Sequence, residues 1–342
     1  MRSRAAATPP SVSVALCTHN GARFVERQLA SIASQTHLPD QVVVSDDAST
    51  DTTKALVEAT FAEWAAAGLK TKTVLMENGT ALGVTQNFEQ ALRACSGDLI
   101  MLSDQDDEWE PHRVATALAA WERFPHVALV ASDAWLIDDS GASLGQTLWS
   151  RLRVTAKERA GLAGPEPWRV LMRRNVVTGA TVALRRSSLE TALPFPDNWV
   201  HDEWLAMMAA LTTGLHLDAT PSVRYRQHAS NVIGVRRLTP RYLWTRIAQD
   251  GSTRNANLLL RAQRLVERCE QLGDKVPEQA LALAQRKLRH ETFRAQLPAS
   301  RWRRVNGICV RWAWRDYSVV GRGFADVVRD LVQPLASTEN TH

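Results

Sequence analysis

Leu99-Ile100-Met101-Leu102 runs directly into Ser103-Asp104-Gln105-Asp106-Asp107-Glu108-Trp109. The apolar run predicts a buried strand, so a cluster of carboxylates gathers where that strand ends. Crowded carboxylates repel one another and lose hydration, and a bound cation relieves both effects. Open α/β sheets bind their ligands beyond the carboxyl ends of the strands. The junction therefore predicts a site for a hard divalent cation such as Mg²⁺, bridged to a diphosphate.

A second interpretation of the same stretch is purely structural. Acidic residues just before a proline are typical of the start of a helix, where the helix dipole favours negative charge. Pro111 stands close behind the cluster. In this interpretation Asp107 or Glu108 caps the next helix and binds nothing.

Apolar runs alternate with helical periodicity through the first 235 residues, which predicts βαβ units and a mostly parallel sheet flanked by helices. The expected strands cover residues 12–17, 42–44, 71–76, 99–102, 127–131, 178–184 and 223–228, and the expected helices cover 22–35, 52–67, 86–94, 111–124 and 201–211. Residues 138–166 have no clear period. We expect a long loop there, of the kind that often forms a binding flap.

Three polar clusters each follow an expected strand. They are Thr18-His19-Asn20-Gly21, Asp46-Asp47 and the Asp104–Asp107 stretch. Because the carboxyl ends of parallel strands meet at one edge of a sheet, we expect the three clusters to lie together. A chance acidic loop has no reason to recur on one edge, so this arrangement favours a functional site.

The composition excludes several classes of protein. The 342 residues contain no apolar run of eighteen or more, which predicts no transmembrane helix. Residues 1–10 are basic but lack an apolar core, so we expect a flexible tail rather than a signal peptide. The four cysteines are scattered, which argues against a zinc site or a disulfide scaffold and favours a reducing, cytoplasmic compartment: Cys17, Cys95, Cys269 and Cys309.

Charge is distributed unevenly along the chain. Residues 236–342 hold 20 Lys and Arg against 10 Asp and Glu, whereas the whole chain has a net charge of +5. This shift predicts a domain boundary near residues 234–237. We expect domains at 11–235 and 236–342, the second a basic helical extension that begins at Thr239-Pro240 and continues to about Val332.

Arginine and tryptophan are concentrated at residues 301–315 of this extension. An amphipathic helix of this composition can lie in a membrane interface, and a lipid-linked substrate would make such an anchor useful. The same pattern also fits a helix that packs on the protein with solvated arginines. Both interpretations stay open. The chain has no recognition motif for nucleic acid, so we expect no nucleic-acid partner.

Six motifs in order along residues 11–235 resemble the inverting family 2 glycosyltransferases of the GT-A fold, in particular the bacterial rhamnosyltransferase-like branch. They are Cys17-Thr18-His19-Asn20-Gly21, Val44-Ser45-Asp46-Asp47-Ala48-Ser49-Thr50-Asp51, Leu82-Gly83-Val84-Thr85-Gln86-Asn87-Phe88, Asp104-Gln105-Asp106-Asp107-Glu108-Trp109, His201-Asp202-Glu203-Trp204 and Gln227-His228-Ala229-Ser230-Asn231. The last hundred residues carry no motif that we can match.

The resemblance implies a role for each matching residue. The nucleotide would be held by a group of polar residues: Thr18, Asn20, Asp46, Asp47, Asn87 and Asp104. Asp106 would ligate Mg²⁺ or Mn²⁺, with Asp104 and His228 nearby. Asp202 would be the general base that deprotonates the acceptor hydroxyl. Simpler roles compete with these, because Asp202 and Asn87 fit helix caps and His228 fits a surface position.

Four further residues are weaker candidates for contact with the donor or acceptor sugar: His201, Glu203, Trp204 and Trp199. His201 stands where the family more often has Glu, so its role is open. Tryptophans can stack on sugar rings but are also ordinary core residues, which is the interpretation that we favour for Trp109.

The implied function is metal-assisted, inverting transfer of a sugar, with rhamnose as one candidate, from a nucleoside-diphosphate donor to a saccharide. The acceptor would be a cell-surface polysaccharide or a lipid-linked saccharide, and the enzyme would work in the cytoplasm or at the inner face of the plasma membrane. A sugar-1-phosphate nucleotidyltransferase is an alternative, but Thr18-His19-Asn20-Gly21 lacks that class's glycine-rich loop with a basic residue. A non-catalytic sugar-nucleotide-binding protein is the other alternative.

Overall fold

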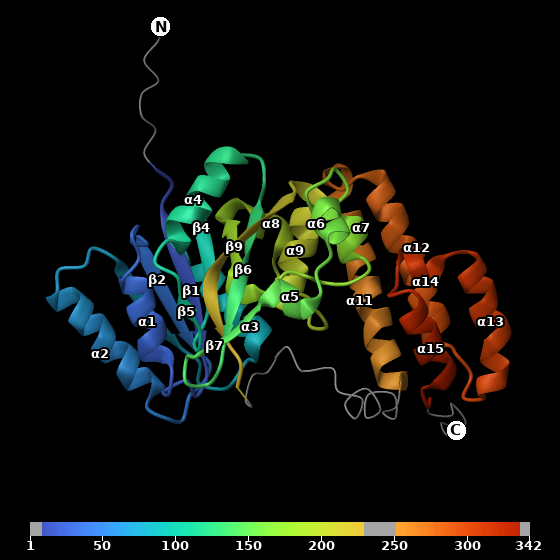
Figure 1. Cartoon of the computed structure of the whole chain (residues 1–342), viewed down its shortest axis with the longest axis horizontal. Coiled ribbons are helices and arrows are strands. Elements are labelled where there is room, and N and C mark those ends of the chain that lie inside the picture. Colours follow the sequence, from blue (N-terminus) through green and yellow to red (C-terminus); the bar gives the residue numbers. More distant parts are fainter. Residues whose placement is uncertain (1–8, 229–250, 336–342) are drawn as a thin grey trace, which may run out of the picture. The chain divides into compact units, whose positions relative to one another are not determined.

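The computed structural model describes residues 9–228 and 251–335 (Figure 1). These residues form two compact units. The first consists of the described residues up to Arg159, Val177–Ala209 and Thr213 onward to the end of β9. The second consists of Ala160–Val176, Ala210–Thr212 and the described residues from Gly251 onward.

The first unit is built on a mixed, mostly parallel sheet with the order β3-β2-β1-β4-β8-β6-β9-β5, and β7 pairs with β6. Its strands are β1 Val12–Thr18, β2 Gln41–Asp46, β3 Lys72–Glu77, β4 Leu99–Asp104, β5 Glu108–Trp109, β6 Leu129–Ile137, β7 Ser143–Thr147, β8 Val182–Arg185 and β9 Leu215–Arg226. Strands β1–β4 are parallel, as is the long ladder between β6 and β9. Strands β5, β7 and β8 run antiparallel to their neighbours.

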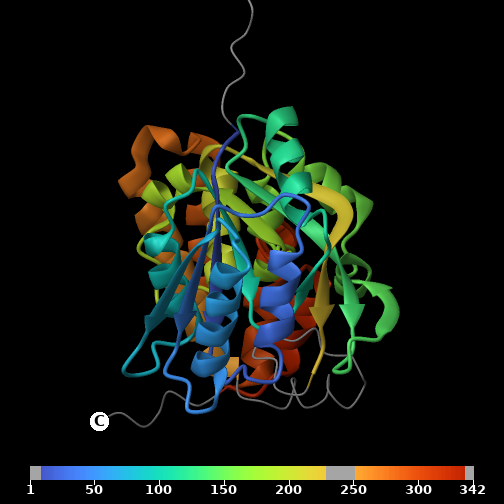
Figure 2. The same cartoon turned by 90° about the vertical axis from the view of Figure 1, so that its left-hand side faces the viewer.

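Helices flank the sheet, as the alternating sequence pattern predicts. They are α1 Val25–Ala33, α2 Thr53–Ala66, α3 Val84–Ala94, α4 Arg113–Arg123, α5 Leu148–Leu152, α6 Ala156–Leu162, α8 Leu189–Ala192 and α9 His201–Thr212. The last residues of α6 and α9, and all of α7 Trp168–Leu171, belong to the second unit. Helices α1 and α2 lie side by side in front of β1–β3 (Figure 2), while α3 packs on β1 and β2. Every side chain of β1 and β2 is buried, which makes these strands the centre of the core.

Several expectations about individual elements were wrong. The structure places Glu108 in the short strand β5, opposite Arg224 of β9, and α4 begins later with His112 at its N-cap. Neither Asp107 nor Glu108 therefore caps a helix. Residues 138–166 are not a bare loop, because they contain β7, α5 and the whole of α6. The expected strand at 178–184 opens with a 3₁₀ turn at Gly179–Thr181.

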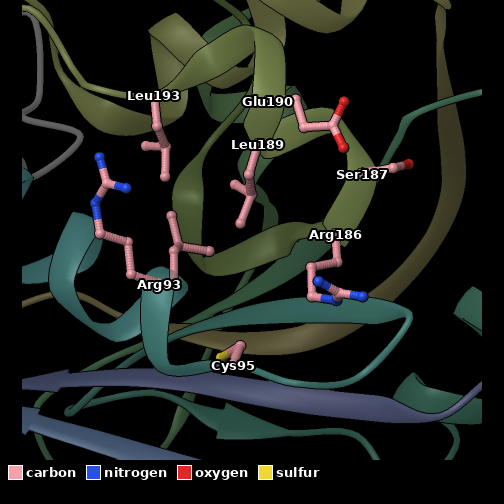
Figure 3. Close-up of a pocket in the computed structure, with 8 residues that line it drawn as sticks. Arg93, Cys95, Arg186, Ser187, Leu189, Glu190 and Leu193 are labelled. Atoms are coloured by element: carbon pink, nitrogen blue, oxygen red, sulfur yellow. The ribbon is translucent and has the colours of Figure 1, made fainter.

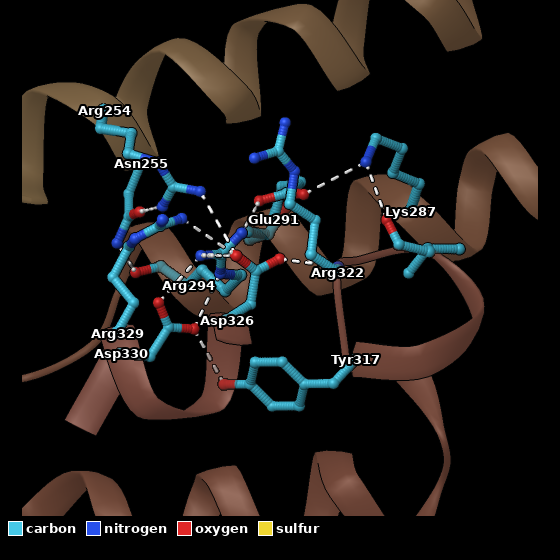
Figure 4. Close-up of polar contacts among 12 residues, drawn as sticks. Arg254, Asn255, Lys287, Glu291, Arg294, Tyr317, Arg322, Asp326, Arg329 and Asp330 are labelled. Atoms are coloured by element: carbon cyan, nitrogen blue, oxygen red, sulfur yellow. Dashed lines mark hydrogen bonds and ion pairs between the residues drawn. The ribbon is translucent and has the colours of Figure 1, made fainter. Parts of the chain in front are cut away.

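The second unit is helical, with α11 Gly251–Leu272, α12 Glu278–Ala295, α13 Arg301–Ala313, α14 Asp316–Val319 and α15 Phe324–Val332. A buried polar network joins α12 to α15 (Figure 4). Arg294 forms two hydrogen bonds with Asp330, at 2.8 and 2.9 Å, and a third with Glu291 at 3.1 Å. Tyr317 donates to the same Asp330 at 2.9 Å. Buried charges are tolerated because each one is paired.

No helix among the described residues is long and apolar enough to cross a bilayer. The expected start of the extension at Thr239-Pro240, and the domain boundary near residues 234–237, lie outside the described residues. The expected series of helices to Val332 is confirmed from Gly251 onward.

Candidate active site

The three polar clusters meet at the carboxyl ends of β1, β2 and β4, as the sequence predicts. Strand β1 lies between the other two, with Thr18 in register with Asp46 and Cys17 in register with Asp104. The Thr18 hydroxyl donates to Asp46 Oδ2 at 2.6 Å. Gln105 accepts from the backbone N–H of His19 at 2.8 Å and donates to its carbonyl at 3.0 Å. Side-chain bonds thus join the loops into one rigid edge.

Asp46 and Asp47 are both buried but have different surroundings. Asp46 is oriented by hydroxyl donors from Thr18 and Ser49, at 2.6 and 2.7 Å. Asp47 accepts from the backbone N–H groups of Leu82 and Gly83, at 2.7 and 2.9 Å. Asp47 therefore anchors the loop that leads into α3, whereas Asp46, which also accepts from the Ser49 N–H at 2.9 Å, holds the loops after β1 and β2 together.

The two asparagines among the predicted nucleotide ligands are already engaged within the protein. Asn87 is 2% exposed and exchanges bonds with Ser45, so it ties α3 to β2 and presents no free surface to a nucleotide. This corrects both interpretations of Asn87, since the N-cap of α3 is Gly83. Asn20 adopts a positive φ of 48° and accepts from the backbone N–H of Thr50 at 2.9 Å. It shapes the loop after β1.

In the acidic half of the site, several carboxylates surround the buried guanidinium of Arg113. Burial, then the charges of Asp106 and Asp202, raise the pKa of Asp104 to about 7. Burial raises the pKa of Asp107 as well, and its Oδ2 has no hydrogen-bond partner. Arg113 is the buried counter-charge, and burial lowers its pKa to about 9. One arginine does not balance these carboxylates, so the cluster is suited to a cation.

Asp106 lies beside His228, which follows β9, the last strand of the first unit. His228 Nε2 is 2.6 Å from Asp106 Oδ2, and the imidazole stacks on Phe24 with ring centroids 5.2 Å apart. Both side chains are partly exposed, at 16% for Asp106 and 11% for His228. The structure thus brings together the two residues predicted to flank the metal, although they are 122 positions apart.

The residues fit a divalent cation that shares its coordination with a substrate. Across the part of the chain that the structure describes, no three His, Cys, Asp or Glu side chains are grouped as a self-sufficient metal site. Mg²⁺ is commonly held by one or two carboxylates, with phosphate oxygens and water completing its shell. Asp106 with Asp104 matches that pattern, and the unbalanced charge of the cluster gives a reason for binding.

Arg226 holds the acidic loop in place, and the sequence analysis missed it. Its side chain is fully buried, and it donates to the Asp106 carbonyl at 2.8 Å and to Glu108 Oε1 at 2.6 Å. Its backbone N–H donates to Asp107 Oδ1 at 2.9 Å. The only hint in the sequence is an arginine at an inward position of the last strand, Val223-Arg224-Tyr225-Arg226.

Replacing Arg226 by Ala should therefore destabilise the first unit by about 3–5 kcal/mol, because Glu108 would keep only Arg224 as a partner and the carbonyls of residues 106, 138 and 139 would lose their donor. Arg226→Lys should recover little, since an ammonium cannot reproduce the planar fork of donors. The free energy of unfolding in urea measures the effect, with the neighbouring, partly exposed Arg224→Ala as the control. Equal stability of the two alanine variants would contradict this role.

Asp202 approaches the acidic cluster from α9. It is the second residue of that helix and is not its N-cap, which is Val200, although its Oδ1 accepts from the first-turn N–H of Glu203 at 2.6 Å. Asp202 Oδ2 accepts from the Gly179 N–H at 2.9 Å. Its charge contributes to the raised pKa of Asp104 and of Tyr225, which places the three groups around one space. A Cβ on residue 179 would come within 2.9 Å of His201, so this approach requires glycine.

His201 is a packing residue in this structure. The ring is buried, stacks on Phe88 at 4.0 Å and has no hydrogen-bond partner on either nitrogen. Burial lowers the pKa of His201 to about 3, so the ring is neutral at physiological pH. A neutral, enclosed imidazole does not contact a sugar, which corrects the weak assignment.

The tryptophans expected to stack on sugars are core residues. Trp204 is completely buried and its indole N–H donates to the Ala192 carbonyl at 2.7 Å. Trp199 is 6% exposed and packs edge-on against Trp204 at 5.1 Å. Trp109 is also buried, as expected, beneath Arg113. Glu203 alone of the weak candidates is half-exposed at the start of α9.

A separate cavity of about 410 Å³ opens at the other end of β4 (Figure 3). It is lined by α3, the segment before β4 and α8, with Arg93, Cys95, Arg186 and Glu190 among its walls. Arg93 is paired with Glu89, and Arg186 donates to the Gly97 carbonyl. Since both arginines of the lining already have partners, we assign it no function.

Solved structures of known proteins share this fold. S. aureus TarS residues 1–349, crystallised with UDP-GlcNAc, superposes with a TM-score of 0.53 at 17% identity. The match covers 83% of this chain and 72% of the TarS chain. At this identity the likeness establishes the fold, which is of the GT-A type.

Curated relatives match parts of the sequence. The dTDP-rhamnosyl transferase RfbG of Shigella flexneri is 25% identical over 225 residues, which cover 64% of this chain and 73% of RfbG. An uncharacterized glycosyltransferase, alr2836 of Nostoc, is 29% identical over 103 residues, or 30% of each protein. The uncharacterized protein Rv1520 of Mycobacterium tuberculosis is 24% identical over 65% of this chain. The chain spans only 30% and 60% of the lengths of the last two.

The model of the family described as glycosyl transferase family 2 matches residues 13–190. This range runs from β1 through β8 and includes the acidic cluster and the loops that surround it. Since the match takes in more than half of the chain, the protein belongs to glycosyl transferase family 2.

Proposed function

We propose that this transferase moves a sugar from a nucleoside-diphosphate donor to a saccharide hydroxyl with inversion at the anomeric carbon, and that Asp202 is its general base. The observation that supports this most directly is the convergence of two acidic groups from distant parts of the chain. Asp202 at the start of α9 adds to the raised pKa of Asp104 at the end of β4. An in-line displacement requires the general base and the diphosphate site to be near each other, on either side of the anomeric carbon.

The proposed chemistry uses residues that the structure orients in advance. Asp202 takes the proton of the acceptor hydroxyl as that oxygen attacks the anomeric carbon, while the bond to the nucleoside diphosphate breaks on the opposite side. The Gly179 N–H bond and the rigid start of α9 keep the Asp202 carboxylate in one orientation. Asp106, with Asp104 beside it, would hold Mg²⁺ or Mn²⁺, which counters the charge of the leaving diphosphate when bound.

For the donor, the support is chemical and comparative. Asp46 is fixed at the loop edge and can accept a bond from a nucleobase N–H or a ribose hydroxyl. TarS was crystallised with UDP-GlcNAc, and RfbG is named a dTDP-rhamnosyl transferase. We propose a pyrimidine nucleoside-diphosphate sugar as the donor class, with dTDP-rhamnose as the first candidate.

The proposal for the acceptor follows from the similarity of this chain to RfbG. RfbG resembles this chain over more of both proteins than alr2836 does. We propose a growing cell-surface polysaccharide or a lipid-linked saccharide as the acceptor, and the cytoplasmic side of the plasma membrane as the place of reaction. The catalytic residues proposed here all belong to the first unit.

Binding of UDP, dTDP, GDP and CDP, with and without Mn²⁺, tests the donor site. We expect one of these nucleoside diphosphates to bind. At a concentration about 100 times its Kd, it should stabilise the folded protein by about 2.7 kcal/mol, which raises Tm by roughly 5–10 °C. We expect this shift in Mn²⁺ and a much smaller one in EDTA, because the diphosphate would otherwise face the carboxylates directly. Thermal unfolding of the full chain provides the readout.

The same panel separates the competing functions. No shift from any diphosphate would contradict the donor site. A shift without release of diphosphate from the matching nucleotide sugar, across a broad acceptor panel, would favour a non-catalytic binding protein. Release of pyrophosphate from a nucleoside triphosphate and a sugar 1-phosphate would favour a nucleotidyltransferase.

A further inference from the structure

The outward side of α13 is apolar, in contrast to an ordinary surface helix. Trp302, Val305, Cys309 and Trp312 recur at spacings of three and four residues, so they form one stripe along the helix. All four are exposed, and Trp302 is exposed by 87%. Asn306 and Ala313 complete this side, which therefore carries no charge.

The orientation of α13 is fixed by its inner side. Ile308 is buried in a cluster with Leu297, Tyr317 and Val327. Arg304 is also buried, and its guanidinium donates to four backbone carbonyls at 2.7 to 2.9 Å: those of Pro298, Ala299, Asp330 and Gln333. A rotation that hid the tryptophans would expose Ile308 and break these bonds. The helix thus holds an arginine inside and its tryptophans outside.

Neighbouring segments of the same unit extend the apolar surface. Phe324, at the start of α15, is 69% exposed and its ring lies 6.4 Å from that of Trp312. Trp314, just after α13, is 62% exposed. We call Trp302, Val305, Cys309, Trp312, Trp314 and Phe324 the α13 surface. This surface includes the three most exposed large hydrophobic side chains of the described chain, which are those of Trp302, Phe324 and Trp314.

The charges around the α13 surface are positive. Arg301, Arg303, Arg315 and Arg322 have exposed side chains, and no Asp or Glu occurs between Glu291 and Asp316. The acidic residues that follow are turned inward. Asp326 and Asp330 are 3% exposed and are neutralised by arginines of the buried network (Figure 4). The exposed arginines are therefore left to act on a partner.

We propose that the α13 surface docks on an anionic phospholipid bilayer, with α13 lying in the plane of the interface. Tryptophan prefers the headgroup level, where its ring is in an apolar layer and its N–H is hydrated. The arginines around the surface match the negative charge of such a membrane. A second copy of the chain would place two sets of exposed arginines against each other, so charge disfavours it as the occupant.

The helix would rest on the membrane rather than enter it. At 13 residues, α13 is too short to span the hydrocarbon layer. Interfacial helices of this kind bury one apolar side at the level of the headgroups. This inference does not depend on the donor site, and it would bring the enzyme to a lipid-linked acceptor if that proposal holds.

Flotation of the full chain with lipid vesicles tests the proposal. We expect the protein to bind vesicles of phosphatidylcholine with about a third phosphatidylglycerol, and to bind vesicles of phosphatidylcholine alone at least about tenfold more weakly. Raising the salt concentration should release it, because screening weakens the attraction between arginines and headgroups.

Two sets of variants separate the apolar and the charged contributions. Trp302→Glu should lower the partition coefficient on anionic vesicles at least about tenfold. The double change Arg301→Gln and Arg303→Gln should lower it about fivefold for each arginine. Leu260→Glu is the matched control, because Leu260 is 42% exposed on α11, outside the α13 surface. It should bind as the original chain does.

Circular dichroism and thermal unfolding verify that the variants are folded, which is expected because each altered side chain is exposed. Failure of the original chain to bind anionic vesicles would overturn the proposal. Equal losses in Trp302→Glu and Leu260→Glu would do so too. A dimer in sedimentation that Trp302→Glu dissociates, without vesicle binding, would assign the surface to a second copy instead.

Discussion

Asp202→Asn should lower the turnover number about 10²- to 10⁴-fold and leave donor affinity within about twofold, because the amide keeps the shape of the carboxylate but cannot accept the acceptor's proton. The Gly179 N–H can still donate to the amide oxygen, and the Glu203 N–H at the start of α9 loses only one side-chain acceptor, so the helix should keep its structure. A loss of turnover with unchanged donor binding is the signature of a group that acts in the transition state.

The measurement is the release of nucleoside diphosphate from the donor that the binding panel selects, with an extract of cell-envelope saccharides as acceptor. Asp197→Asn is the matched control, since Asp197 is an exposed aspartate five positions earlier. Turnover by Asp202→Asn within about threefold of the original chain would exclude Asp202 as the base. A parallel loss of donor affinity would mean that Asp202 contributes to the donor site instead.

Local sequence patterns predicted the order of the elements in the first unit. The strands β1, β2 and β4 are short apolar runs, and the helices α1 and α3 have clear apolar periodicity, so each of these elements can be recognised without knowing its partners. The gathering of Thr18, Asp46 and Asp104 followed from topology alone, because parallel neighbours end at the same edge. The same logic explains why their loops form a single site.

The errors arose where long-range contacts decide the structure. Glu108 looked like a helix cap, but it pairs with Arg224 and Arg226, more than a hundred positions away. Asn87 looked like a nucleotide ligand, but its side chain is hydrogen-bonded to Ser45 of β2. Trp204 is a residue type that can stack on a sugar ring, and only the packing of α9 shows that its side chain is buried. No pattern of local periodicity contains this information.

The acidic cluster shows how a functional site departs from the most stable arrangement. Burial, and then repulsion from neighbouring carboxylates that include Asp106, raises the pKa of Asp104 and of Asp107, which means that their ionised forms are disfavoured in the folded protein. Arg113 offsets only part of this charge. Buried carboxylates that repel one another are retained where a bound ligand relieves the repulsion. The cluster and the proposed donor site therefore support each other.

Asp106→Asn should therefore have two opposite effects. In Mn²⁺ it should weaken binding of the nucleoside diphosphate at least about tenfold, because the cation loses a carboxylate ligand. Without metal it should stabilise the folded protein slightly, because one charge leaves a repulsive cluster while the amide can still bond to His228. Titration of the diphosphate in Mn²⁺ and in EDTA, with thermal unfolding of the unliganded protein, measures both effects.

The pair of effects distinguishes a metal ligand from a structural residue. A structural aspartate would lose stability on substitution and would alter binding equally in Mn²⁺ and EDTA, whereas a ligand loses affinity only when the cation is present. Glu122→Gln, at an exposed position on α4, controls for the change in net charge and should alter neither quantity. Donor affinity unchanged in Asp106→Asn would remove Asp106 from the metal site. The excess charge of the cluster would then have to be relieved by a group other than a cation held at this carboxylate.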